Sequence, residues 1–249
     1  MAYFSGQGKV EIAPLINGVP GLYRWVGNVP DFKLTFDTDK LEHKESWSGQ
    51  RLLDKVITKE NKAKVTAELE EWSKENVALA VRGEATNIAG GVVTAINPDV
   101  SPAVLPAGGI WALKHQKVSL LTVKDSADPQ LTVDPADYVL DPVFGTITIV
   151  DSAGYTLPFK ANYTYEAVEN VAFFTQPITE VAVRFEGINT ADQNKKVLVE
   201  AYRIALDPSK ELGLINDEFG TFQLEGNALV DSSKPSDPVF GYFGRMVYL

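Results

Sequence analysis

The stretch that decides the fold is Asp31-Phe32-Lys33-Leu34-Thr35-Phe36-Asp37, in which polar and apolar residues alternate strictly. A period of two is typical of a β-strand that buries one face and exposes the other to water. Residues 62–70 repeat the pattern, with one face formed by Ala63, Val65, Ala67 and Leu69 and the other by Lys64, Thr66, Glu68 and Glu70. These two stretches predict a pair of half-buried strands.

The segment between the two strands, residues 38–61, is dense in charges of both signs and has no sustained period. Trp47, Ser48 and Gly49 lie near its middle. The pattern predicts a long loop or arm, and loops beyond about 12–15 residues in compact domains are usually functional or disordered. We treat residues 38–61, called the arm from here on, as a candidate functional segment; the alternative is a flexible hairpin tip.

Local signals predict the neighbouring elements. Asn17-Gly18 favours a type I′ turn and therefore a hairpin between residues 9–16 and 19–28. A short helix is expected from an N-cap at Ser73 to a stop at Gly83, with Glu75 suited to its first turn. Its apolar side is expected to cover the apolar faces of the two alternating strands.

The composition shifts toward Ala, Gly and Pro from Thr86 onward, which indicates a boundary. We expect residues 87–171 to form a β-rich insertion, with strands at 117–123, 146–150 and 159–167. Strand patterns resume as a paired hairpin at 180–186 and 196–206, followed by a helical turn at 209–214 and by strands at 219–230 and 242–249. The expected fold is mainly β, with a core formed by residues 1–86 and 172–249.

Composition limits the classes of function. The chain has 249 residues, enough for a substantial core, and no cysteine, which excludes disulfides and thiolate metal sites. Its 23 basic and 33 acidic residues give 23 − 33 = −10, a balance that repels phosphate backbones. A sequence-reading nucleic-acid binder is not expected, and neither is a membrane protein, because no apolar run approaches the roughly 18 residues of a membrane span.

Signatures of catalysis are weak in this sequence. His43 and His115 have no partner at metal-ligand spacing, and we find neither a Gly-x-Ser-x-Gly elbow nor a dinucleotide fingerprint. The acidic pairs Glu70-Glu71 and Asp217-Glu218 are of the kind that serves glycoside hydrolysis, but such pairs arise by chance among 33 acidic residues. No enzyme, cofactor or metal is expected.

The order of these features resembles the tail tube (major tail) proteins of long-tailed bacteriophages. The likeness is carried by residues 27–36 (GNVPDFKLTF) and 63–83 (AKVTAELEEWSKENVALAVRG), and near the C-terminus by 183–190 (VRFEGINT), 201–208 (AYRIALDP) and 222–226 (FQLEG). It covers roughly residues 1–86 and 172–231 and leaves the middle section unaccounted for.

The resemblance implies a virion protein, assembled in the host cytoplasm, that forms stacked and usually hexameric rings. The ring strands line a β-barrel through which DNA passes without specific binding, and the other partners would be the tail terminator, tape measure and distal tail proteins. The residues expected to face the lumen are Asp31, Lys33, Thr35, Lys64, Thr66, Glu68 and Glu70. The residues expected to make contacts between rings belong to the arm: Asp39, Lys40, Glu42, Lys44, Glu45, Trp47, Arg51, Asp54 and Lys55.

Two other classes of function stay open. One is a carbohydrate- or receptor-binding β-sandwich module on a virion or cell surface, for which Trp25, Trp47, Trp72 and Trp111 could serve as stacking platforms, although single tryptophans are more often core or interface residues. The other is a β-sandwich hydrolase built around an acidic pair.

Overall fold

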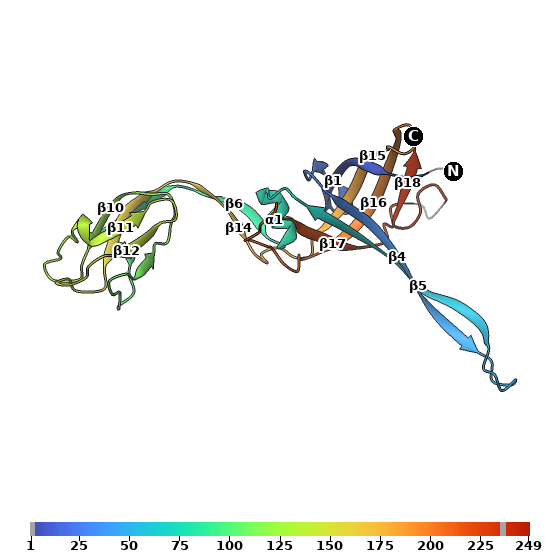
Figure 1. Ribbon diagram of the computed structural model, residues 1–249, viewed down its shortest axis with the longest axis horizontal. Coiled ribbons are helices and arrows are strands. Elements are labelled where there is room, and N and C mark those ends of the chain that lie inside the picture. The colour runs from blue at the N-terminus through green and yellow to red at the C-terminus, as the bar shows by residue number, and fades with distance from the viewer. Residues whose placement is uncertain (1–2, 235–237) are drawn as a thin grey trace. The chain divides into compact units, whose positions relative to one another are not determined.

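The structure is a computed structural model that describes residues 3–234 and 238–249. The chain is mainly β and divides into two compact units. The first combines the chain up to Ala85 with the chain from Val171 onward, and the second is Thr86–Asn170. The divisions lie one residue before the expected ones at each junction. Figure 1 shows the elements along the chain.

The first unit is built on a nine-stranded antiparallel sheet. Its main path runs β2-β1-β15-β16-β17-β5-β4, with β3 paired to β1 and β18 paired to β16. The strands are β1 (Gly6–Ile16), β2 (Val19–Pro20), β3 (Arg24–Trp25), β4 (Asp31–Lys44), β5 (Leu53–Leu69), β15 (Glu180–Asn189), β16 (Lys195–Asp207), β17 (Phe222–Ala228) and β18 (Gly244–Tyr248).

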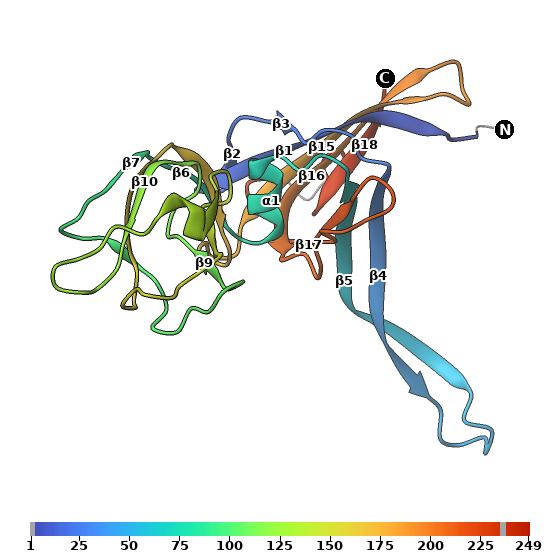
Figure 2. The same ribbon diagram turned by 60° about the vertical axis from the view of Figure 1, so that its left-hand side comes forward.

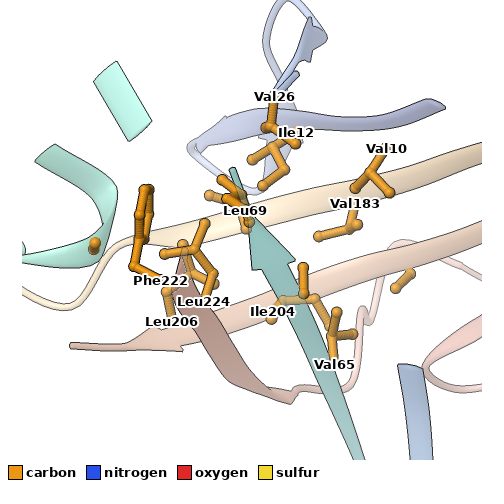
Figure 3. Packing of buried hydrophobic residues seen from close by; sticks show 14 of the residues in the cluster. Val10, Ile12, Val26, Val65, Leu69, Val183, Ile204, Leu206, Phe222 and Leu224 are labelled. Carbon is orange, nitrogen blue, oxygen red and sulfur yellow. The ribbon is translucent and has the colours of Figure 1, made fainter. Parts of the chain in front are cut away.

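The sheet curls so that its far strands meet across the core. Phe32 of β4 stacks on Phe185 of β15, with ring centroids 5.8 Å apart, although three strands separate β4 from β15 in the sheet. The enclosed side chains come from β1, β5, β15, β16 and β17, as Figure 3 shows for Val10, Ile12, Val65, Val183, Ile204 and Leu224. The apolar face predicted for residues 62–70 is buried, and Phe32 and Leu34 of the face predicted for residues 31–37 pack against the core, whereas Phe36 of the same face is exposed.

The short helix α1 (Lys74–Ala80) adds Ala80 and, just after its last turn, Val81 to the same core. Ser73 caps it as predicted, because its side chain accepts a hydrogen bond from the Asn76 backbone N–H. The predicted C-terminal end is wrong by one residue: Arg82, not Gly83, takes the left-handed conformation, with φ of 47°. The helix stays in place because the buried Asn76 amide donates to the carbonyl oxygens of Val26 and Glu71.

Several strand predictions hold and others need correction. The Asn17-Gly18 turn is present, with positive φ at both residues, but its second strand is broken into the short β2 and β3. The predicted hairpin of residues 180–186 and 196–206 is formed by β15 and β16. The helical turn expected at 209–214 is wrong, because these residues form irregular chain.

The second unit contains two small sheets around a core of its own. One sheet runs β10 (Val118–Lys124), β13 (Lys160–Tyr165), β7 (Gly91–Val93), with β8 (Asp99–Val100) paired to β13. The other runs β11 (Tyr138–Asp141), β12 (Thr146–Ile149), β9 (Ile110–Ala112). The 3-10 turn η1 (Pro135–Asp137) precedes β11, and β6 (Glu84–Ile88) pairs with β14 (Val168–Ala172) where the chain passes between the units. The insertion is thus a β-sandwich, and among the residues that the structure describes its core has no member in common with the core of the first unit.

Candidate assembly surfaces

The segment expected to be a long loop or arm is an arm, and it is formed by two paired strands that the sequence analysis did not predict. β4 and β5 stay in register from Asp31↔Glu68 out to Lys44↔Leu53, with small bulges after Asp39 and His43. β17 pairs with β5 only as far as Lys64, so beyond that point the two strands pair only with each other. Figures 1 and 2 show this hairpin projecting from its sheet. The backbone hydrogen bonds between β4 and β5 continue outward from the root and hold the arm in an extended form, although its sequence has no strand pattern.

Polar and charged side chains of the arm contact one another across the hairpin. His43 Nδ1 lies 2.5 Å from an Asp54 oxygen, Lys59 lies 3.8 Å from Asp39, and Thr38 donates to the Asn61 side chain at 3.1 Å. These groups are exposed, and exposed pairs contribute at most about 1 kcal/mol each. They leave the arm polar along its edges and available to a partner.

The tip of the arm is organised by one carboxylate, that of Glu45. It accepts hydrogen bonds from the backbone N–H groups of Trp47 and Ser48, both at 2.8 Å, and from that of Leu52 at 3.2 Å. The Ser48 hydroxyl donates to it as well, and these bonds lower the pKa of Glu45 from its ordinary value of 4.5 to about 2. The four bonds hold the backbone of the tip around the carboxylate, so the tip is an ordered loop. They are strongest to the ionised carboxylate and therefore favour that form.

The structure separates Glu45 from the other residues expected to contact the next ring. Glu45 is buried under its own loop, so its carboxylate is hydrogen-bonded within the chain and is not exposed to a neighbouring ring. Trp47 is the opposite case, with 85% of its surface exposed at the tip. The remaining expected contact residues are exposed on the hairpin or its tip: Asp39, Lys40, Glu42, Lys44, Arg51, Asp54 and Lys55.

The residues expected to face a lumen lie together on the side of the sheet away from the core. The register pairs Asp31 with Glu68, Lys33 with Thr66 and Thr35 with Lys64, which places these six on one face. Glu70 follows the end of β5 and accepts a hydrogen bond from the Asn28 side chain. The lysines are offset by acids: Lys33 pairs with Asp31, and Lys64 lies 2.6 Å from Glu225.

Three polar residues of β17 extend this face and were not singled out from the sequence. The register sets Gln223 beside Glu68, Glu225 beside Thr66 and Asn227 beside Lys64. Hydrogen bonds from Lys64 and Lys210 lower the pKa of Glu225. The alternation within Phe222–Ala228 was a usable signal for them. We call the face formed by these residues of β4, β5 and β17 the polar wall.

An apolar groove opens on the other face, at the root of the arm. It has a volume of about 600 Å³ and lies between the β4–β5 hairpin and the strands β16 and β18. Leu34, Phe36 and Val65 line one side, and Val199, Tyr242 and Met246 line the other. No pattern in the sequence predicted this groove, because its two sides lie more than 130 residues apart in the chain.

Two strands also leave a sheet edge open. In the part of the chain that the structure describes, β4 has a hydrogen-bonded neighbour only in β5, and β18 only in β16. Unpaired edges are ready to add a strand from another chain.

The groups weighed for catalysis or metal binding fall elsewhere. His43 is on the arm, and His115 is half-buried between Tyr163 and Tyr165. Glu70 and the pair Asp217-Glu218 line a shallow surface depression together with Glu68. Within residues 3–234 and 238–249, no group of three or more His, Asp or Glu side chains is arranged to hold a metal ion.

The four tryptophans do not form a common surface. Trp111 is buried in the core of the second unit, Trp72 packs edge-on against Phe222, and Trp25 is half-exposed beneath the Lys9 ammonium. Only Trp47 is almost fully exposed. No helix in the described part of the chain has the length and apolar character needed to cross a bilayer.

The protein is therefore of a mainly-β class in which a curled antiparallel sheet with a projecting hairpin carries a separate small sandwich. It belongs to the family described as "Protein of unknown function UCP028589", whose model matches residues 3–247. A comparison with curated proteins finds no match.

Proposed function

We propose that the protein is a structural subunit that assembles with copies of itself into stacked rings, as the tail tube of a long-tailed bacteriophage. The observation that carries the proposal is the β4–β5 hairpin. Its root bears a polar wall on one face and core residues on the other, and its outer half pairs, among the described residues, with no further strand of its sheet. The outer half adds no residue to the core of the first unit as the structure describes it, whereas a projecting hairpin is of use in an assembly.

The polar wall suits the lining of a water-filled channel. Its apolar back is covered by the core, so the wall can face water without loss of stability. The wall carries two lysines and four acids, a net charge of 2 − 4 = −2 for each chain, and this excess of negative charge repels the phosphate backbone, so DNA can pass without being held. The acidic residues are Asp31, Glu68, Glu70 and Glu225. The open edges of β4 and β18 provide the positions at which neighbouring sheets join around a ring.

The arm supplies the contact from one ring to the next. A head-to-tail contact between identical chains produces a filament when it does not close into a ring. A projecting segment that docks on a different surface of the next chain makes a head-to-tail contact of this kind. On this proposal the protein works in the virion, is assembled in the host cytoplasm, and needs neither catalysis nor a cofactor.

Negative-stain microscopy of the purified protein tests the proposal. The expected result is rings or tubes with a central hole; a protein that stays monomeric at high concentration would contradict it. The matched variant replaces residues 42–56 by Asn-Gly, which joins the paired Leu41 and Ile57 through the same turn that the chain uses between Ile16 and Val19. This variant should fold and should form no long tubes, whereas tubes of normal length would exclude a role for the arm in stacking.

A further inference from the structure

The groove at the root of the arm exposes several large apolar side chains to solvent. Phe36 is 74% exposed, Tyr242 60% and Met246 43%, and all three line the same groove. Burial of apolar surface is favourable by about 25 cal/mol per Å², so covering these side chains would stabilise an assembly. The groove volume of about 600 Å³ is within the range of roughly 300–1,000 Å³ that is typical of sites for compact ligands, which leaves room for an aromatic side chain and its neighbours.

The tip of the arm presents a side chain that fits such a groove. Trp47 is almost fully exposed, and Leu52 and Leu53 beside it are more than half exposed. The loop that carries Trp47 is fixed by the bonds to Glu45, so little conformational freedom remains to be lost on docking. Buried aromatic anchors in apolar pockets are the usual centres of strong protein contacts.

The two features cannot meet within one chain. Phe36 and Trp47 are 11 residues apart along an extended strand, a separation of at most about 37 Å at about 3.4 Å per residue. The hairpin pairing keeps the tip away from its own root. A second copy displaced along the arm by roughly that length would bring its groove to the tip of the first, and the same contact would repeat without closing.

We infer that the groove formed by Leu34, Phe36, Val65, Val199, Tyr242 and Met246 is the socket for Trp47 of a second copy of this chain. The inference rests on the proposed function and deepens it, because it names the surface that receives the arm. We assign the groove to a second copy because the same chain carries an exposed apolar groove at the root of the paired hairpin and the exposed Trp47 at its tip. The Arg245–Glu200 ion pair, 2.7 Å long, borders the groove and provides a polar rim around the apolar floor.

Cross-linking tests this contact directly, because the native chain has no cysteine. One chain carries Ser46→Cys, at an exposed position that leaves the neighbouring Trp47 in place, and a second chain of different size carries Met246→Cys. The two are mixed under assembly conditions and treated with a short bismaleimide. The expected product is the mixed dimer, and a chain with both substitutions should give a ladder of higher species. Adding Phe36→Ala to the Met246→Cys chain should reduce the mixed product, because it removes part of the socket. Thr35→Cys, at an exposed position on the face of β4 away from the groove, replaces Met246→Cys as the control and should give no mixed dimer with Ser46→Cys.

The outcomes separate the inference from the proposed function. Rings or tubes in the microscope without the mixed dimer overturn the socket and leave the proposed function standing. Dimers formed by Ser46→Cys alone, in place of the mixed dimer, would mean that tips meet tips and would also overturn it. Absence of assemblies from the unsubstituted protein, together with absence of cross-linked product from the mixture, overturns both.

Discussion

Phe32 and Phe185 stack with an interplanar angle of 25° between two strands that are not neighbours in the sheet. This contact joins β4, the strand that begins the arm, to β15, which is three strands away in the sheet order and lies across the core. It therefore holds the curl that places the polar wall on one side and the core on the other.

Replacing Phe32 by alanine is expected to destabilise the first unit. Removal of a buried Phe costs about 3–5 kcal/mol, and because Phe32 is only half-buried we expect about 2 kcal/mol. Chemical denaturation of the unassembled protein measures the change. Phe36→Ala is the matched control, since Phe36 lies on the same face of β4 but is mostly exposed. An equal loss of stability in both variants would contradict the role given to the stack.

The contrast between these two residues also shows what the sequence can reveal. Alternation is a local property, so the strands at 31–37 and 62–70, their apolar faces and the polar wall were predictable from residues alone. The groove was not, because Phe36 and Met246 are brought together only by the curl of the sheet and by the course of β16, which pairs with β17 at one end and with β18 at the other.

The arm was predictable as a segment but not as a hairpin. Its residues do not alternate, and its register sets like charges opposite each other at Asp39 and Glu60. Pairing there continues from the root, where Phe36 faces Ala63, and no local pattern encodes it. The organising role of Glu45 was missed for a similar reason, because a carboxylate that binds its own loop looks in sequence like any other charge of the arm.

The two units are expected to unfold separately, because their cores, in the described part of the chain, have no residue in common. Leu69→Ala should lower the stability of the first unit by about 2–5 kcal/mol and Phe159→Ala that of the second by about 3–5 kcal/mol, since both side chains are fully buried. Differential scanning calorimetry should resolve two transitions, each shifted by one substitution. A single transition moved by both variants would mean that the units fold as one.

The polar wall is expected to be reachable only from inside an assembled tube. Thr35→Cys places a single thiol on the exposed part of this wall, in a chain that has no other cysteine. In tubes it should react with a small maleimide and be protected from a maleimide attached to a polymer too large to enter the channel. The same thiol in unassembled protein, kept below the concentration at which rings and tubes form, should react with both reagents, as a gel shift would show. Equal reaction of tubes with the large reagent would place the wall on the outside.

The tip of the arm should lose its order in acid because of Glu45. Its pKa is about 2 in the folded tip and near 4.5 when the bonds are absent, so the stabilisation is complete above pH 4.5 and is lost as the pH falls toward 2. The amide resonances of Trp47 and Ser48, which donate to this carboxylate, should therefore titrate with a midpoint near 2. Glu45→Gln should abolish this titration and speed amide exchange of the tip at neutral pH, whereas Glu42→Gln, at an exposed position, should leave both unchanged. A midpoint near 4.5 would show that the tip is not held by Glu45, and the case for Trp47 as a pre-formed anchor would weaken with it.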